Sequence, residues 1–184
     1  MSRVHSAALA ALALALTSLP AAAAFQVDGK AKISFFAEGS PGALDIEGKS
    51  TELSLTDDGT TVTATVPLSS VTTGIDLRDD HMKNKYLEIA TFPDVVLTFS
   101  RAELQLPTEL AQSTTGTVQA TFTAHGISQP ATVRYTLKKS KTGYAVDASF
   151  DYDISKHGVE IPSYLGVTVD PAQNARVRFD LLDQ

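Results

Sequence analysis

Apolar and polar residues alternate along most of this chain, and that period of two restricts the fold more than any other feature of the sequence. In the segment TVTATVPL, residues 61–68, Val62, Ala64 and Val66 alternate with threonines. The same pattern recurs at residues 117–124, 131–137, 144–154 and 175–181. Successive side chains of a β-strand point to opposite faces, so each segment has one apolar and one polar face. The pattern predicts half-buried strands of an antiparallel sheet whose other side meets solvent.

Turn signals divide the alternating region into strands. Asp57-Asp58-Gly59 and Lys141-Thr142-Gly143 stand between alternating runs and predict hairpin turns, because glycine tolerates the positive φ that tight turns need. Most prolines of the region fall at or near the ends of runs, where a missing N–H does not interrupt a ladder. We predict eight strands, at residues 26–38, 42–56, 60–68, 94–105, 114–125, 129–139, 143–155 and 173–182. Regularly spaced strands of this kind predict a sandwich or a barrel.

Residues 79–88, DDHMKNKYLE, break the alternation. The acidic residues come first and the lysines later, which suits a short helix because negative charge is favourable in the first turn. This helix would lie in the long link between the third and fourth strands.

The first 24 residues differ in kind from the rest. They hold Arg3, an apolar run from residue 7 to 19, and the small residues Ala22-Ala23-Ala24. The run is shorter than the roughly 20 residues that span a bilayer, so the pattern predicts a secretory signal peptide at 1–24 rather than a retained anchor. We therefore expect one domain at 25–184, without an integral membrane segment, in the periplasm, with release beyond the cell left open.

Composition removes several classes of protein. The chain has no cysteine, so disulfides, thiolate metal sites, a cysteine nucleophile and a lipidated cysteine are excluded. It carries 21 acidic and 15 basic residues, and the basic ones are scattered, which argues against nucleic-acid binding. Neither a G-x-S-x-G elbow nor a glycine-rich phosphate loop occurs, so a serine nucleophile and nucleotide chemistry lack support.

The ionisable residues support only weak hypotheses about a site. His81, His125 and His157 could together hold zinc, but no two of them have the spacing of metal ligands on one strand or helix, so we expect no metal. Asp151 and Asp153 share one face of a strand, and could be a glycosidase pair or, as we prefer, solvated outer residues.

The densest ionisable cluster is Arg78-Asp79-Asp80-His81. It has two interpretations. Arg78 and His81 could bind an anionic head group, oriented by Asp79. We favour the structural interpretation, in which Asp79 or Asp80 caps the helix and Arg78 pairs with a carboxylate to brace the crossover. A metal-assisted hydrolase using His81 is a further, weaker hypothesis.

Three stretches of the chain resemble the YceI-like family of exported, lipocalin-like proteins that bind polyisoprenoid lipids. The matching positions in the first stretch, residues 69–99, are Arg78, Asp79, His81, Phe92, Pro93 and Phe99, with Met82 in place of leucine. The second stretch is residues 116–137 around HGISQPAT, and the third is residues 153–158 before the final strand. The resemblance covers nearly all of the chain after the leader.

The resemblance implies a single all-β, lipocalin-like, eight-stranded antiparallel β-barrel with the short helix near one mouth. It implies a periplasmic, non-enzymatic carrier that holds a polyisoprenoid or similar long-chain lipid in the lumen, with no other cofactor. Arg78, Asp79 and His81 would lie at the mouth or brace the crossover. The inward candidates for lining the lumen are Phe35, Val66, Leu97, Phe99, Phe122, Tyr135, Phe150 and Phe179.

An eight-stranded barrel can also be filled by its own side chains, and from composition alone a packed core is the simpler expectation. The alternative function is therefore a filled-core module that acts through its outer surface in envelope interactions or stress. A homodimer is left open.

Overall fold

A computed structural model describes residues 24–41, 44–164 and 166–183. Apart from Ala24, the predicted signal peptide lies outside the described residues. The strands are β1 (Phe25–Ser40), β2 (Leu44–Ser50), β3 (Ser54–Asp57), β4 (Thr61–Pro67), β5 (Asp94–Ser100), β6 (Ser113–Ala124), β7 (Ile127–Lys139), β8 (Gly143–Asp153), β9 (Ser163–Tyr164), β10 (Val167–Val169) and β11 (Ala172–Asp183). The helical segments are η1 (Leu68–Ser70), α1 (Asp76–Asp80), η2 (His81–Tyr86), η3 (Arg101–Glu103) and η4 (Ile154–His157).

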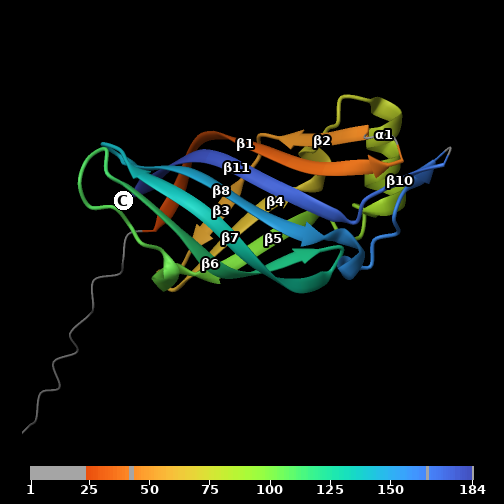
Figure 1. Ribbon diagram of the computed structural model, residues 1–184. Helices are drawn as coiled ribbons and strands as arrows, with labels where there is room; N and C mark the ends of the chain where they lie inside the picture. The colour runs from red at the N-terminus through yellow and green to blue at the C-terminus, as the bar shows by residue number, and fades with distance from the viewer. Residues whose placement is uncertain (1–23, 42–43, 165, 184) are drawn as a thin grey trace, which may run out of the picture.

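All strands pair antiparallel in one sheet that curls strongly into a half-barrel (Figure 1). The order is β3-β4-β5-β6-β7-β8-β11-β1-β10-β9, with β2 paired to β1 as well. The curl brings β3 alongside β1, and this seam is bridged by the Ala31 amide on the Thr51 carbonyl at 3.2 Å and by the Phe25 amide on Asp57 at 3.0 Å. The seam lacks the ladder of hydrogen bonds that joins the other neighbours.

The predicted hairpin turns are confirmed. Gly59 has φ +86°, and the Asp58 carboxylate accepts from the amides of Thr60 and Thr61 at 2.8 and 2.7 Å. At the β7–β8 turn, Ser140 and Gly143 exchange hydrogen bonds of 2.9 and 3.0 Å. Short polar side chains thus satisfy the backbone where the ladder stops.

The predicted number of eight strands is wrong, because the described residues alone form eleven. The predicted strand at 42–56 is two strands: β2 pairs with β1, and β3 pairs with β4. The apolar positions shift from even numbers at Leu44 and Ile46 to odd numbers at Leu53 and Leu55, and this change of phase marks the break that the prediction passed over. The other additions are β9 and β10, short strands that lie between the predicted strands at 143–155 and 173–182; β10 pairs with the end of β1.

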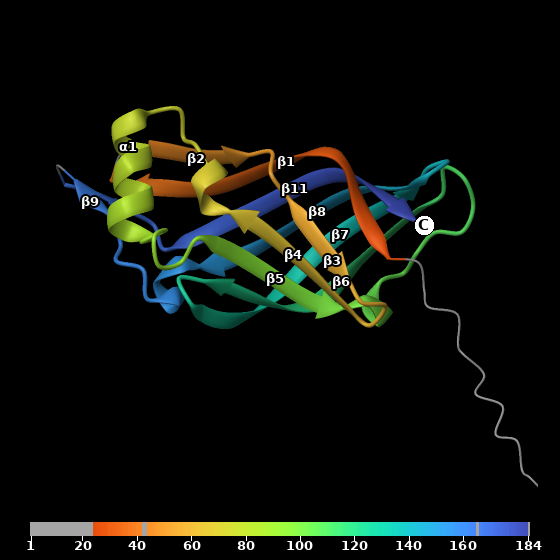
Figure 2. The same cartoon turned by 180° about the vertical axis from the view of Figure 1, so that it is seen from behind.

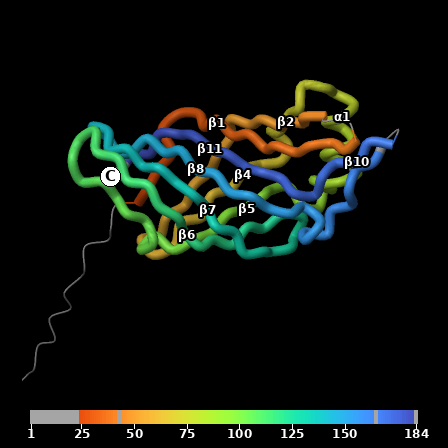
Figure 3. The backbone as a smooth tube through the Cα atoms, in the orientation of Figure 1, coloured from red at the N-terminus to blue at the C-terminus, as the bar shows by residue number. Residues whose placement is uncertain are grey.

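The predicted helix exists between β4 and β5, but it begins earlier than expected. The five-residue α1 continues directly into η2, which is a π-helix. Figure 2 shows this helical segment lying across one end of the curled sheet, and the C-terminus lies at the other end. We call these the helix end and the closed end; the tube view shows how far apart they are (Figure 3).

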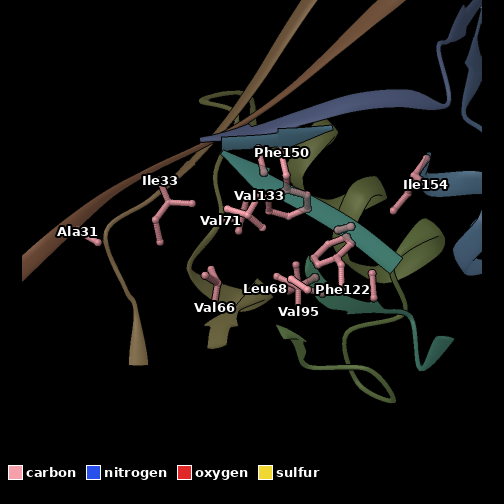
Figure 4. Close-up of a cluster of buried hydrophobic side chains, with 14 of the residues drawn as sticks. Ala31, Ile33, Val66, Leu68, Val71, Val95, Phe122, Val133, Phe150 and Ile154 are labelled. Carbon is pink, nitrogen blue, oxygen red and sulfur yellow. The ribbon is translucent and has the colours of Figure 1, made fainter. Parts of the chain in front are cut away.

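Two groups of apolar side chains fill the interior. The larger includes Ile33, Val66, Val95, Phe122 and Phe150 (Figure 4). The smaller group consists of Phe25, Val62, Tyr144 and Leu181, and it plugs the closed end. Leu68 and Val71 extend the larger group toward the helix end, where the half-buried residues Met82, Tyr86, Leu87 and Ile89 pack over it.

Candidate functional site

An apolar cavity lies in the middle of the curled sheet. Its volume, counted as the space open to the centre of a water-sized sphere, is about 80 Å³. Strands from every side of the sheet contribute residues to its wall. Arg176 is the one charged residue among these lining residues. The lining residues are Ile33, Phe35, Leu53, Ala64, Val66, Val95, Val96, Leu97, Phe122, Val133, Ala148, Phe150, Ala175, Arg176 and Val177. A space lined in this way suits an uncharged, apolar ligand.

Five of the eight residues predicted to face the lumen line this cavity: Phe35, Val66, Leu97, Phe122 and Phe150. The other three lie elsewhere in the interior. Phe99 and Phe179 pack where the two apolar groups meet. Tyr135 is buried, and its hydroxyl accepts a hydrogen bond of 2.9 Å from the Gln105 amide.

Small residues create the space, and the prediction had passed over them in favour of large rings. Ala64, Ala148 and Ala175 line the cavity from β4, β8 and β11. Their side chains end at Cβ, so the interior is not filled at their level. The signal was present in the sequence, because each alanine stands in an alternating run with larger apolar residues.

Phe122 and Phe150 line the cavity and belong to a cluster of aromatic rings. The Phe122 ring centroid lies 5.0 Å from that of Phe150, 5.0 Å from Tyr152 and 5.1 Å from His157. Burial raises the pKa of Tyr152 far above its ordinary range, so its hydroxyl stays neutral; it donates to Gln173 Oε1 at 2.9 Å. His157 is buried, with Nδ1 2.8 Å from the Ile127 carbonyl oxygen. Because a carbonyl only accepts, Nδ1 carries a proton.

Arg78 and Asp79 hold the loop that leads into α1. The Asp79 carboxylate accepts from the Thr72 hydroxyl at 2.6 Å, from the Thr73 amide at 2.7 Å and from the Thr73 hydroxyl. Partial desolvation opposes ionisation of Asp79, but these hydrogen bonds outweigh it and hold the pKa of the carboxyl below its ordinary value. Arg78 donates from Nε to the Thr73 hydroxyl at 2.8 Å and from Nη2 to the Thr73 carbonyl at 2.9 Å.

This arrangement agrees with a bracing role for Arg78 and Asp79, although the partners differ from those expected. The residue before α1 is Ile75, and no side chain caps this helix. Asp79 instead reaches back to the preceding loop, and Arg78 binds Thr73 instead of a carboxylate. His81 is exposed and lies apart from the cavity lining.

A polar cleft lies beside Arg78 on the outside of β2. It is lined by Asp45, Glu47, Lys49, Thr72, Thr73, Gly74 and Arg78, and about 360 Å³ of it can take the centre of a water-sized sphere. Glu47 and Lys49 form an ion pair at 2.9 Å. This contact, followed by a hydrogen bond from Ser34, lowers the pKa of the Glu47 carboxyl. The cleft therefore offers two carboxylates and two cations.

The remaining ionisable candidates have structural contacts. Asp151 is exposed and accepts from Asn174 at 2.7 Å and from Arg134 at 2.9 Å, and these contacts lower the pKa of its carboxyl. Asp153 caps η4 by accepting from the Ser155 amide at 3.0 Å. The two carboxylates thus serve different structural contacts and do not form a shared cleft.

His125 lies against an aromatic ring and an acidic side chain. The His125 ring lies 4.3 Å from the Phe92 ring, and its Nε2 is 3.7 Å from Glu88 Oε1. In the described ranges, no three His, Cys, Asp or Glu side chains are grouped so that they could hold a metal ion. Among the helices that the structure describes, none has the length and apolar character to cross a bilayer.

A strongly curled antiparallel sheet with an apolar interior and a short helix across one end defines the lipocalin-like class of fold. The sequence model of the YceI-like domain matches residues 20–181, and the chain belongs to the YceI-like family. No curated protein matches the sequence.

Two solved structures share this fold. A polyisoprenoid binding domain from Saccharophagus degradans, implicated in plant cell wall breakdown, superposes with a TM-score of 0.71 at 13% identity, covering 88% of this chain and 99% of the other. Burkholderia cenocepacia BcnA superposes with a TM-score of 0.64 at 15% identity, covering 82% and 95%. At these identities, the likeness shows the fold alone.

Proposed function

We propose that this protein is a non-enzymatic, periplasmic carrier that holds a polyisoprenoid or similar long-chain lipid in its central cavity. The observation that carries the proposal is the cavity itself, whose walls are apolar on all sides of the curled sheet. Family membership supports the proposal, as does the structural likeness to a polyisoprenoid binding domain. The described site residues serve structural contacts, and binding a lipid tail needs no catalytic group.

The energetics favour such a ligand. Burying a methylene group contributes about 0.8 kcal/mol, and association costs on the order of 4–15 kcal/mol. Enclosing roughly 5 to 19 methylene groups offsets that cost, and an isoprenoid tail of tens of carbons contains enough of them. The single charged residue among the lining, Arg176, is occupied with Asp147 at 2.7 Å, so it does not favour a charged group inside the cavity.

The test is direct identification of a bound lipid. Protein purified without detergent would be extracted with organic solvent, the extract analysed by mass spectrometry, and the emptied protein titrated with a fluorescent prenyl probe. We expect a prenyl lipid in the extract and saturable uptake of the probe. A repeatedly empty extract together with no uptake would overturn the carrier function and leave the filled-core module that acts through its surface.

A matched pair of variants ties uptake to the cavity. Ala148 lines the cavity and Ala145, on the same strand, is exposed. Ala148→Leu should fill space and weaken probe binding about tenfold or more, whereas Ala145→Leu should leave binding unchanged. Equal effects of the two substitutions would show that the probe binds elsewhere.

A further inference from the structure

Exposed apolar side chains gather at the helix end. Among the described residues, six large hydrophobic side chains are exposed, and five of them stand in or next to α1 or near a strand terminus on the side of the helix end. They are Phe36, Leu44, Ile75, Leu77 and Ile127, with exposures of 40%, 47%, 53%, 67% and 41%. The sixth, Leu110, is 63% exposed and lies in the connection between β5 and β6 at the closed end.

The positions of these residues in the fold place them around the helix end. Leu44 is the first residue of β2 and Ile127 the first of β7. Ile75 directly precedes α1 and Leu77 lies in its first turn. Phe36 lies on β1 a few residues before that strand ends at Ser40. Large apolar side chains that surround one end of an elongated molecule mark an interaction surface.

Charged residues at the helix end indicate which kind of partner surface it can bind. The exposed carboxylate of Asp45 follows Leu44, and that of Asp76 stands between Ile75 and Leu77. The whole chain has a formal net charge of −6. A strongly anionic partner would be repelled, so apolar contact must provide the attraction.

The polar cleft beside this end adds a second indication. Its four charged residues are two carboxylates, Asp45 and Glu47, and two cations, Lys49 and Arg78. Glu47 and Lys49 already pair with each other, so the cleft has no excess of either charge and does not repel a lipid head group that carries both a phosphate and an ammonium. A bilayer of zwitterionic lipids therefore matches this end in both its apolar and its polar parts.

The helix end is also the more weakly closed end. No residue of α1 or η2 is fully buried. The segment rests on the half-buried Met82, Tyr86, Leu87 and Ile89 and on hydrogen bonds such as that from Lys83 Nζ to the Ser69 carbonyl at 2.8 Å. The closed end has a fully packed apolar group and the ion pair of Arg101 with Asp57. Segments with few buried contacts open at lower free energy than packed ones.

We propose that the helix end docks on the surface of a zwitterionic lipid bilayer through Leu44, Ile75, Leu77 and Ile127, so that a lipid tail passes between membrane and cavity beneath the α1–η2 segment. This inference rests on the proposed lipid-binding function and adds its partner surface.

The test measures binding of the purified protein to vesicles by flotation. We expect binding to phosphatidylcholine–phosphatidylethanolamine vesicles that weakens when phosphatidylglycerol is added. The double substitution Ile75→Ser with Leu77→Ser should lower the partition constant about tenfold, because the apolar area that enters the interface is removed. Leu110→Ser, at the closed end, is the matched control and should leave the partition constant unchanged. A second pair, Leu44→Ser with Ile127→Ser, repeats the test should the first variant fold poorly.

Three results would overturn the docking proposal. The first is absence of binding to zwitterionic vesicles, and the second is an equal loss of binding in the Leu110→Ser control. The third is a mass of two chains, measured by light scattering, that falls to one chain in the Ile75→Ser, Leu77→Ser variant, because the surface would then join two copies of the protein. Uptake of a water-dispersed prenyl probe is measured in parallel. Uptake without vesicle binding rejects docking alone, whereas vesicle binding without uptake rejects the carrier function and leaves the docking surface standing.

Discussion

Arg101 forms an ion pair with Asp57 whose carboxylate is fully enclosed, at the closed end of the curled sheet. The same carboxylate accepts from the Phe25 amide at 3.0 Å and from the Gly59 amide at 2.9 Å. The Arg101 guanidinium carbon also lies 4.0 Å from the centre of the Phe25 ring. One acid thus joins the beginning of β1, the β3–β4 turn and η3, which are far apart in the sequence.

Removing one partner of this pair should destabilise the fold. Asp57→Asn keeps the shape but leaves Arg101 without its counter-charge, and breaking a buried pair costs about 3–5 kcal/mol. Urea unfolding followed by circular dichroism measures the loss. The double variant Asp57→Asn with Arg101→Met should recover part of it, because no unpaired charge remains; additive losses would contradict a direct coupling.

The loop that leads into α1 should loosen in acid. The pKa of Asp79 is depressed in the folded state, so its contribution to stability is present above the ordinary carboxyl pKa and is lost as pH falls through the lower, folded value. Asp79→Asn should remove the contribution at every pH. Hydrogen exchange of residues 72–86 at neutral pH should therefore be faster in Asp79→Asn.

Asp80 supplies the control for that experiment. It is exposed, and its carboxylate accepts from Asn84 Nδ2 at 2.7 Å, within the helical segment. Asp80→Asn should leave exchange of the Thr73 amide unchanged. Equal acceleration in both variants would mean that charge on the helix, and not the contacts with Thr72 and Thr73, holds the loop.

His157 should matter for stability and His81 should not. His157 is 1% exposed, packs on Phe122 and bonds the Ile127 carbonyl. His157→Ala leaves a void and removes the hydrogen bond to the Ile127 carbonyl, for which a loss of roughly 2–4 kcal/mol is expected. The exposed His81→Ala should change the free energy of unfolding by less than about 0.5 kcal/mol. Thermal unfolding of the two variants compares them directly.

Two turn glycines should differ in their tolerance of alanine. Gly126 and Gly59 both have positive φ, of 72° and 86°. A Cβ on Gly126 would come within 2.7 Å of the Phe92 ring, whereas a Cβ on Gly59 meets nothing within 4 Å. Gly59→Ala should lose about 1 kcal/mol from backbone strain alone, and Gly126→Ala distinctly more. Similar melting temperatures for the two variants would show that Phe92 moves aside freely.

The architecture followed from the sequence because alternation reports which side of a strand is buried. It gave the all-β class, the hairpin turns at Gly59 and Gly143 and the helical link before β5. It did not report which strand a segment pairs with, so the change of partner between β2 and β3 was missed. Nor did it find β9 and β10, whose two and three residues are too short to show a period.

Only part of the cavity lining was predicted, and the reason is related to the one for the strands. Large rings were chosen as lining, and Phe35, Phe122 and Phe150 do line the cavity. Phe99 and Phe179 face the same interior but lie toward the closed end. A residue's depth along the axis depends on the stagger of the strands, which the alternation of apolar and polar residues does not report. The space itself depends on Ala64, Ala148 and Ala175, whose small side chains are visible in the sequence but whose meeting at one cavity depends on how the strands are paired.

The seam between β1 and β3 has a consequence for what the interior can hold. Its edges meet through the Ala31 amide, the contacts of Asp57 and packed side chains, whereas neighbouring strands elsewhere are joined by ladders. The interior can therefore widen or narrow at the seam while the hydrogen-bond ladders between the other strands stay intact. An interior whose width changes in this way accommodates ligands of different thickness, so methyl-branched and unbranched lipid tails could be held by the same protein.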